Sequence, residues 1–72
     1  MKVRYSKHAR ERLRSRGISR REVEEALMGA QRRSLQGHGT IKCVYTKKDF
    51  KLVVVYQQQK ENYLIVSAYY EN

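Results

Sequence analysis

Apolar residues change their spacing once along the chain, at Gly29. Before this glycine they recur every three or four positions, as at Val23, Ala26 and Leu27, which is typical of helices with one apolar face. After it they alternate with polar residues, which is typical of strands. The pattern predicts two helices in the first half of the chain and a sheet formed mainly by the second half.

Capping signals set the limits of the two helices. The first is expected over 7–16 with a stop at Gly17, because glycine adopts the left-handed conformation after a helix at little cost. Ser19 and Glu22, three residues apart, form a capping box. The second helix is therefore expected over 20–28.

The strands determine the expected fold class. They are expected over 2–5, 31–36, 40–45, 50–57 and 63–70. The fourth is apolar on both faces and belongs at the centre of the sheet, and short loops between the later strands favour antiparallel pairing. The chain is predicted to form one α+β domain over 1–72, with two helices packed on one face of a curved antiparallel sheet of four to five strands. We expect the other face of the sheet to be partly open.

Charge narrows the class of partner. The 72 residues include 16 Lys and Arg against 7 Asp and Glu, which gives a net charge of +9. Most of this excess lies in the first half of the chain, and arginine has a planar fork that suits phosphate. A chain this short has little room to enclose a large cofactor. Nucleic acid, as RNA or the ribosome, is the favoured partner, and a solvated surface without a ligand is the open alternative.

Cysteine and hydropathy point to a location. A single cysteine, Cys43, forms no intrachain disulfide, and no signal peptide is visible at the start of the chain. The apolar runs are far shorter than the roughly 20 residues of a membrane span. We therefore expect a cytoplasmic protein that does not use a membrane. Two histidines and one cysteine do not readily build a metal site, so no metal and no cofactor is expected.

His8, Arg12 and Arg16 lie four residues apart on the first predicted helix and therefore share one of its faces. An imidazole near two guanidinium groups can act as a base while the arginines hold a phosphate. The three residues are therefore candidate catalytic residues. The alternative is structural, with His8 bonded to backbone at the helix start and both arginines solvated.

Tyr69 and Tyr70 are neighbours in the last predicted strand and point to opposite faces of the sheet. A tyrosine on the face away from the helices can stack on a base or donate its hydroxyl to a phosphate. Both are candidate catalytic residues, with packing in the sheet as the alternative. Strict alternation along this strand puts Val66 and Ala68 on one face and Ile65 on the other. Five further cations are candidate RNA-binding residues: Lys7, Arg10, Arg14, Arg32 and Arg33.

The segment from Ser6 to Ser19 resembles small prokaryotic domains with an H-A-x-x-R-x-x-x-R-G-I signature, which here begins at His8. The resemblance continues through a helix of the E-V-E-E-A-L type and into the V-S-A-Y-Y end of the last strand, and so covers nearly the whole chain. Those domains form a family of unknown function that looks like distant members of the RelE/ParE toxin superfamily.

The resemblance implies a RelE-like toxin of a toxin-antitoxin system, an mRNA interferase that needs no metal and is neutralised by an acidic antitoxin. In such an endoribonuclease the RNA 2′-hydroxyl attacks the adjacent phosphorus, cations neutralise the developing charge, and a base and an acid move the protons. His8 or a C-terminal tyrosine would move protons here, and the charge would come from Arg12, Arg16, Arg32 or Arg33. Two alternatives stay open. One is a non-catalytic basic module that binds RNA or the ribosome. The other is an interaction protein, such as a relative of the gyrase-directed toxins, whose charge only keeps it soluble or meets an acidic antitoxin.

Strand edges suggest a further partner. The first strand and the polar segment 31–36 are expected at the edges of the sheet, where unpaired backbone groups can accept another strand. A homodimer formed by edge pairing, or the addition of an antitoxin segment, is therefore an expectation.

Overall fold

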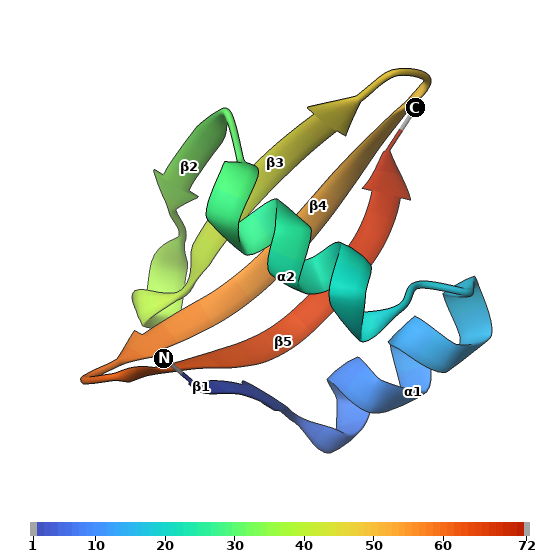
Figure 1. The fold of residues 1–72 in the computed structure, drawn as a ribbon. Coiled ribbons are helices and arrows are strands. Elements are labelled where there is room, and N and C mark those ends of the chain that lie inside the picture. The colour runs from blue at the N-terminus through green and yellow to red at the C-terminus, as the bar shows by residue number, and fades with distance from the viewer. Residues whose placement is uncertain (1, 72) are drawn as a thin grey trace.

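The elements follow one another as a strand, two helices and four strands in the computed structural model, which describes residues 2–71 (Figure 1). They are β1 (Lys2–Tyr5), α1 (Lys7–Arg16), α2 (Arg20–Gly29), β2 (Arg32–Leu35), a 3₁₀ turn (Gly37–Gly39), β3 (Ile41–Lys47), β4 (Phe50–Gln59) and β5 (Asn62–Glu71). Every expected helix and strand is present, and the α+β class is confirmed.

Capping defines both helices. The Ser6 side chain accepts a hydrogen bond from the Ala9 N–H at 3.0 Å, and Gly17 follows α1 with a left-handed φ of 66°. Ser19 and Glu22 form the predicted capping box, with bonds of 3.0 and 3.1 Å. Neither helix in the described range has the length and apolar character that a membrane span requires.

The five strands form one mixed sheet in the order β1-β5-β4-β3-β2 (Figure 1). Strands β2 to β5 pair antiparallel, and β4 lies in the middle as expected. However, β1 pairs parallel with β5, from Lys2 opposite Asn62 to Tyr5 opposite Ile65. The prediction of an antiparallel sheet is wrong here, because no short turn joins β1 to β5 and sets its direction. Strands β1 and β2 are the two edge strands, as predicted.

A β-bulge in β5 changes which of its side chains face the helices. Adjacent residues of β4 pair with Ile65 and Ser67, so Val66 between them has no cross-strand partner. Ile65 and Ala68 consequently point to the same side, and both are fully buried in the core. The predicted strict alternation is wrong at this point because a bulge adds one residue that the hydrophobic period does not reveal.

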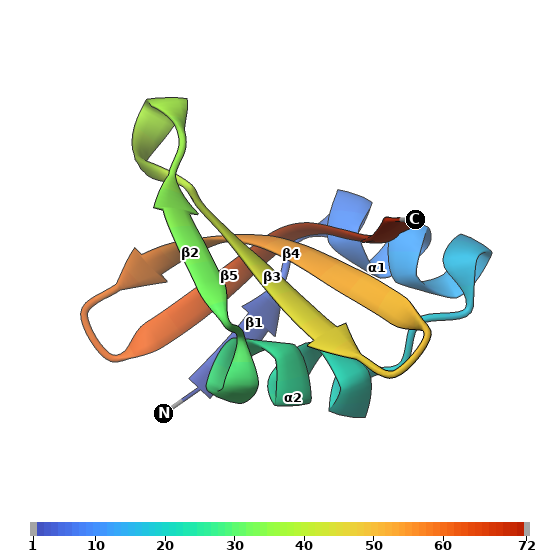
Figure 2. The ribbon, with the colours of Figure 1, turned by 90° about the horizontal axis from the view of Figure 1, so that it is seen from above.

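The helices bury one side of the sheet, which we call the helix face. α2 lies across β3 and β4, and α1 lies along β5 next to β1 (Figure 2). Their shared core consists of Ala9, Leu13, Ile18, Val23, Ala26, Leu27, Cys43, Leu52, Val54, Tyr56, Ile65 and Ala68. The opposite side, which we call the open face, has neither helix across it (Figure 2).

Candidate nucleic-acid interface

The open face carries three rows of side chains that run across the strands. Paired residues of neighbouring strands lie on the same face, as do alternate residues along one strand. The middle row, from β2 to β5, is Arg32, Val44, Val53 and Tyr69. The row on one side is Ser34, Lys42, Val55 and Ser67, and the row on the other is Thr46, Lys51 and Glu71.

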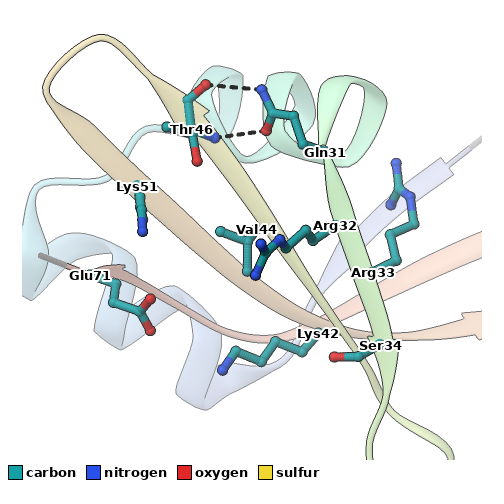
Figure 3. A pocket seen from close by; sticks show the side chains of 9 residues that line it. All are labelled: Gln31, Arg32, Arg33, Ser34, Lys42, Val44, Thr46, Lys51 and Glu71. Atoms are coloured by element: carbon teal, nitrogen blue, oxygen red, sulfur yellow. Dashed lines mark hydrogen bonds between the residues drawn. The ribbon is translucent and has the colours of Figure 1, made fainter.

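Three cations of these rows line a groove of about 680 Å³ (Figure 3). They are Arg32, Lys42 and Lys51, and Glu71 adds a carboxylate at the β5 side. Within residues 2–71 the only ion pair joins Lys47 of β3 to a glutamate of α2. The three groove cations are therefore free of carboxylate partners in that range and available to an anionic ligand.

Two hydrogen bonds fix the start of β2 at the rim of this groove. The Gln31 side chain donates to the Thr46 carbonyl oxygen at 3.1 Å and accepts from the Thr46 N–H at 2.9 Å (Figure 3). This pair of bonds extends the ladder between β2 and β3 by one residue through a side chain. It holds the backbone from which Arg32 projects into the groove.

Arg16 reaches from the last turn of α1 to the far end of the middle row. Its guanidinium donates to the Ala68 carbonyl oxygen at 2.8 Å, a group of β5 beyond the point where β1 ends, at Tyr5 opposite Ile65. The Arg16 Cζ atom lies 5.9 Å from the centre of the Tyr69 ring, which is cation–π distance. The structure thus brings together Arg16 and Tyr69 from the predicted catalytic set.

Two valines form an apolar floor between Arg32 and Tyr69. Val53 is 0% exposed although no helix covers this face. Its neighbours in the row, Val44 and Tyr69, are half-buried and lie beside it on the adjacent strands. The open face therefore has a small apolar centre with cations around it.

Arg33 borders the groove, but its guanidinium lies on the helix face (Figure 3). It donates to the Tyr56 hydroxyl at 3.1 Å and to the Leu27 carbonyl oxygen in the last turn of α2. A cation bonded to the last carbonyls of a helix stabilises that end of the helix. The structure therefore gives this predicted RNA-binding residue a role in holding α2 against β2.

Tyr70 lies on the helix face, apart from Arg16 and Tyr69. Its hydroxyl donates to the Glu22 carboxylate of α2, and its ring meets the Phe50 ring edge-on at a centroid distance of 5.5 Å. The hydrogen bond to Glu22 raises the pKa of Tyr70 to about 12, and the same bond lowers the pKa of Glu22. Tyr70 thus holds its proton firmly and links α2 to β5.

The remaining predicted residues lie on the exposed surface of α1. His8 and Arg12 share a flank of the helix with Arg16, and within residues 2–71 their side chains make no hydrogen bond. The spacing along α1 places three cations on the side turned away from its buried residues, and all three are exposed: Lys7, Arg10 and Arg14.

A family model described as "Domain of unknown function (DUF4258)" matches residues 5–70. The chain belongs to this family. The match begins at the last residue of β1 and includes both helices and nearly all of the groove. No curated protein and no solved structure matches the chain. The expected membership of a small family without an assigned function is thus confirmed.

Two cations of the groove in this DUF4258 domain, Lys42 and Lys51, were not among the predicted site residues. The signal was present in the sequence, because Lys42 alternates with the apolar Ile41 and Cys43 and therefore faces away from the core. Lys51 follows the same rule in β4. The predicted site residues come from clusters of arginine in the first half of the chain, and single lysines in the strands form no such cluster.

Metal-ligating side chains do not gather in the DUF4258 domain. Within residues 2–71 no three His, Cys, Asp or Glu residues form a cluster able to hold a metal ion. Cys43 is fully buried with its Sγ atom 4.0 Å from the Ala26 carbonyl oxygen, and burial raises the pKa of its thiol. It therefore behaves as the small hydrophobic residue that the sequence predicts.

Proposed function

We propose that this domain binds single-stranded RNA on the open face of its sheet. The observation that carries the proposal is the groove of Arg32, Lys42 and Lys51, three cations free of carboxylate partners within residues 2–71. Proteins that bind single strands commonly combine such a cationic groove, which follows the phosphates, with aromatic side chains. Tyr69 supplies an aromatic group on the same face, and the net charge of +9 attracts a polyanion from a distance.

RNA cleavage, as in a RelE-like toxin, is the second candidate and is favoured by a separate observation. Arg16 and Tyr69 lie together at the β5 edge of the sheet, and His8 and Arg12 share the flank of α1 with Arg16. In this reaction the RNA 2′-hydroxyl attacks the adjacent phosphorus, and the bond from phosphorus to the 5′-oxygen of the next nucleotide breaks. Arg16 neutralises the developing charge, and Tyr69 and His8 are the groups that would take the proton of the 2′-hydroxyl and give a proton to the leaving oxygen. Such a toxin would act at the ribosome and be neutralised by an acidic antitoxin.

Fluorescence anisotropy with a labelled single-stranded RNA tests the binding proposal. Lys42→Ala and Lys51→Ala each remove one groove cation, and Lys60→Ala removes one charge from the β4–β5 turn as a matched control. The logarithm of the binding constant should fall linearly with the logarithm of salt concentration, and each groove variant should reduce that slope by about 0.7. The Lys60→Ala slope should equal that of the wild type. Equal losses in all three variants would mean that net charge, and not the groove, binds RNA.

A denaturing gel of the same RNA, with and without translating ribosomes, separates binding from cleavage. Products that disappear in Arg16→Gln and Tyr69→Phe would assign cleavage to the pair at the β5 edge. If the products also disappear in His8→Ala, the imidazole takes part in the reaction. Salt-sensitive binding without products in any lane would leave the domain as an RNA-binding module.

A further inference from the structure

Two arginines stand at opposite ends of the middle row of the open face. Arg32 begins the row on β2, and Arg16 stacks on Tyr69 at its end on β5. Between β2 and β5 the row crosses three strand-to-strand steps of about 4.8 Å each, so its ends are roughly 14 Å apart. An anionic chain held at both ends would have to span this distance.

The surface between the two arginines is apolar. Val44 and Val53 occupy the row there, and the two groove lysines lie in the rows on either side. Phosphates gain nothing over valine side chains, whereas sugars and bases can pack on them. The arrangement favours a strand whose outer phosphates lie at the arginines and whose inner nucleotides cover the valines.

The guanidinium of Arg16 is oriented before any ligand arrives. One of its N–H groups bonds to the Ala68 carbonyl oxygen at 2.8 Å, and its Cζ atom lies 5.9 Å from the Tyr69 ring centre. A guanidinium has five N–H donors, so others remain for a phosphate. A fork that is already held in place loses little rotamer freedom on binding. Arg32 makes no such hydrogen bond within residues 2–71, so Arg16 is the rigid end of the row.

We propose that the open face binds a segment of about four nucleotides that crosses the strands from Arg32 to Arg16, with one outer phosphate at each guanidinium. Successive phosphates of an extended single strand are about 7 Å apart, so a span of roughly 14 Å corresponds to two such steps, which separate the outer two of the three phosphates in a tetranucleotide. The inference rests on the proposed RNA binding and adds the direction and the length of the bound segment.

Oligouridylates of two, four, six and eight nucleotides test the span by anisotropy. The proteins are the wild type, Arg16→Gln, Arg32→Gln, the double variant and Lys60→Gln as a charge-matched control. Glutamine at position 16 keeps an amide donor for the Ala68 carbonyl oxygen but removes the charge. Thermal melts show whether each variant is folded. If Arg16→Gln does not fold, the length series with the wild type and Arg32→Gln tests the span.

The expected affinity rises steeply from two to four nucleotides and only slightly beyond four. With the tetranucleotide, Arg16→Gln and Arg32→Gln should each reduce the salt slope by about 0.7, and the double variant by the sum. A dinucleotide reaches only one end, so each single variant should lose about twofold in affinity while the double variant loses binding. Lys60→Gln should match the wild type at every length.

Three results would overturn the inference. A steady rise in affinity up to eight nucleotides, or a tetranucleotide affinity insensitive to Arg16→Gln, would contradict the span while leaving RNA binding in place. Absence of RNA binding by the wild type would remove both the span and the proposed function. Tight binding of poly-glutamate with the same dependence on Arg16 and Arg32 would assign the face to an acidic protein instead.

Discussion

Arg32 and Arg33 are adjacent in β2 but serve opposite faces of the sheet, so replacing each with alanine should separate RNA binding from stability. Arg33→Ala removes hydrogen bonds to the Tyr56 hydroxyl and to the Leu27 carbonyl oxygen. Bonds from a charged donor contribute about 1.5–3 kcal/mol when buried, and a cation at a helix C-terminus about 0.3–1 kcal/mol. The Arg33 side chain is exposed, which weakens these bonds. We therefore expect a total loss of about 1–2 kcal/mol in the free energy of unfolding.

Urea denaturation followed by circular dichroism measures this loss, and thermal melts should show the melting temperature of Arg33→Ala lowered by about 5–15 °C. Arg33→Lys should recover only part of the stability, because an ammonium lacks the fork that reaches both acceptors. Arg32→Ala should change the free energy of unfolding by less than about 0.5 kcal/mol and weaken RNA binding.

The reasoning would be refuted by either of two results. One is an equal loss of stability in Arg32→Ala and Arg33→Ala, which would mean that the two guanidinium groups are not on different faces. The other is an equal loss of RNA affinity in the two variants, measured at a temperature where both are folded. Either result would contradict the division between the groove and the helix layer.

Two further predictions concern single contacts. Tyr70→Phe removes the hydroxyl whose hydrogen bond lowers the pKa of Glu22. The stability that the bond between Tyr70 and Glu22 adds is fully present above the ordinary carboxyl pKa of 4.5. It is lost as pH falls through the lower pKa that Glu22 has in the folded protein. Because the pKa of Tyr70 itself is raised to about 12, the contribution persists below pH 10.0 and is lost as pH approaches 12. Urea midpoints measured across pH should therefore show Tyr70→Phe less stable than the wild type by up to about 1 kcal/mol between these two limits. In strong acid the two proteins should be equally stable. A difference in stability that does not depend on pH would contradict this reasoning. Gly17→Ala should lower the free energy of unfolding by about 1–2 kcal/mol, because φ is 66° at this position. Gly37→Ala is the control: its added Cβ also meets no atom, and it should change the free energy of unfolding little. Equal urea midpoints for the two variants would count against backbone strain at Gly17.

Local signals made the helices and most strands predictable. The Ser19 and Glu22 capping box and the Gly17 stop involve residues within one helical turn, so the sequence contains all the information that they need. The direction of β1 and the bulge at Val66 depend on pairing with strands elsewhere in the chain. Neither turn residues nor hydrophobic period carries that information, and both predictions were wrong.

The candidate site was predictable only in part. Helical spacing places His8, Arg12 and Arg16 on one flank of α1, and alternation places Tyr69 and Tyr70 on opposite faces. The spacing does not reveal that Arg16 meets a carbonyl group 52 residues away. That contact exists because β1 ends early and leaves part of the β5 edge to α1.

By itself the sequence determined where the helices begin and end, which chain segments are strands, and that the protein is strongly basic, because these properties depend on neighbouring residues or on composition alone. Only the tertiary structure decided which charges meet. It gathered Arg32, Lys42 and Lys51 from three strands, turned Arg33 toward α2, and engaged Tyr70 with a carboxylate. The physical reason is that strand register is set by burial of one face of the whole sheet, and register alone places side chains from distant segments in one groove.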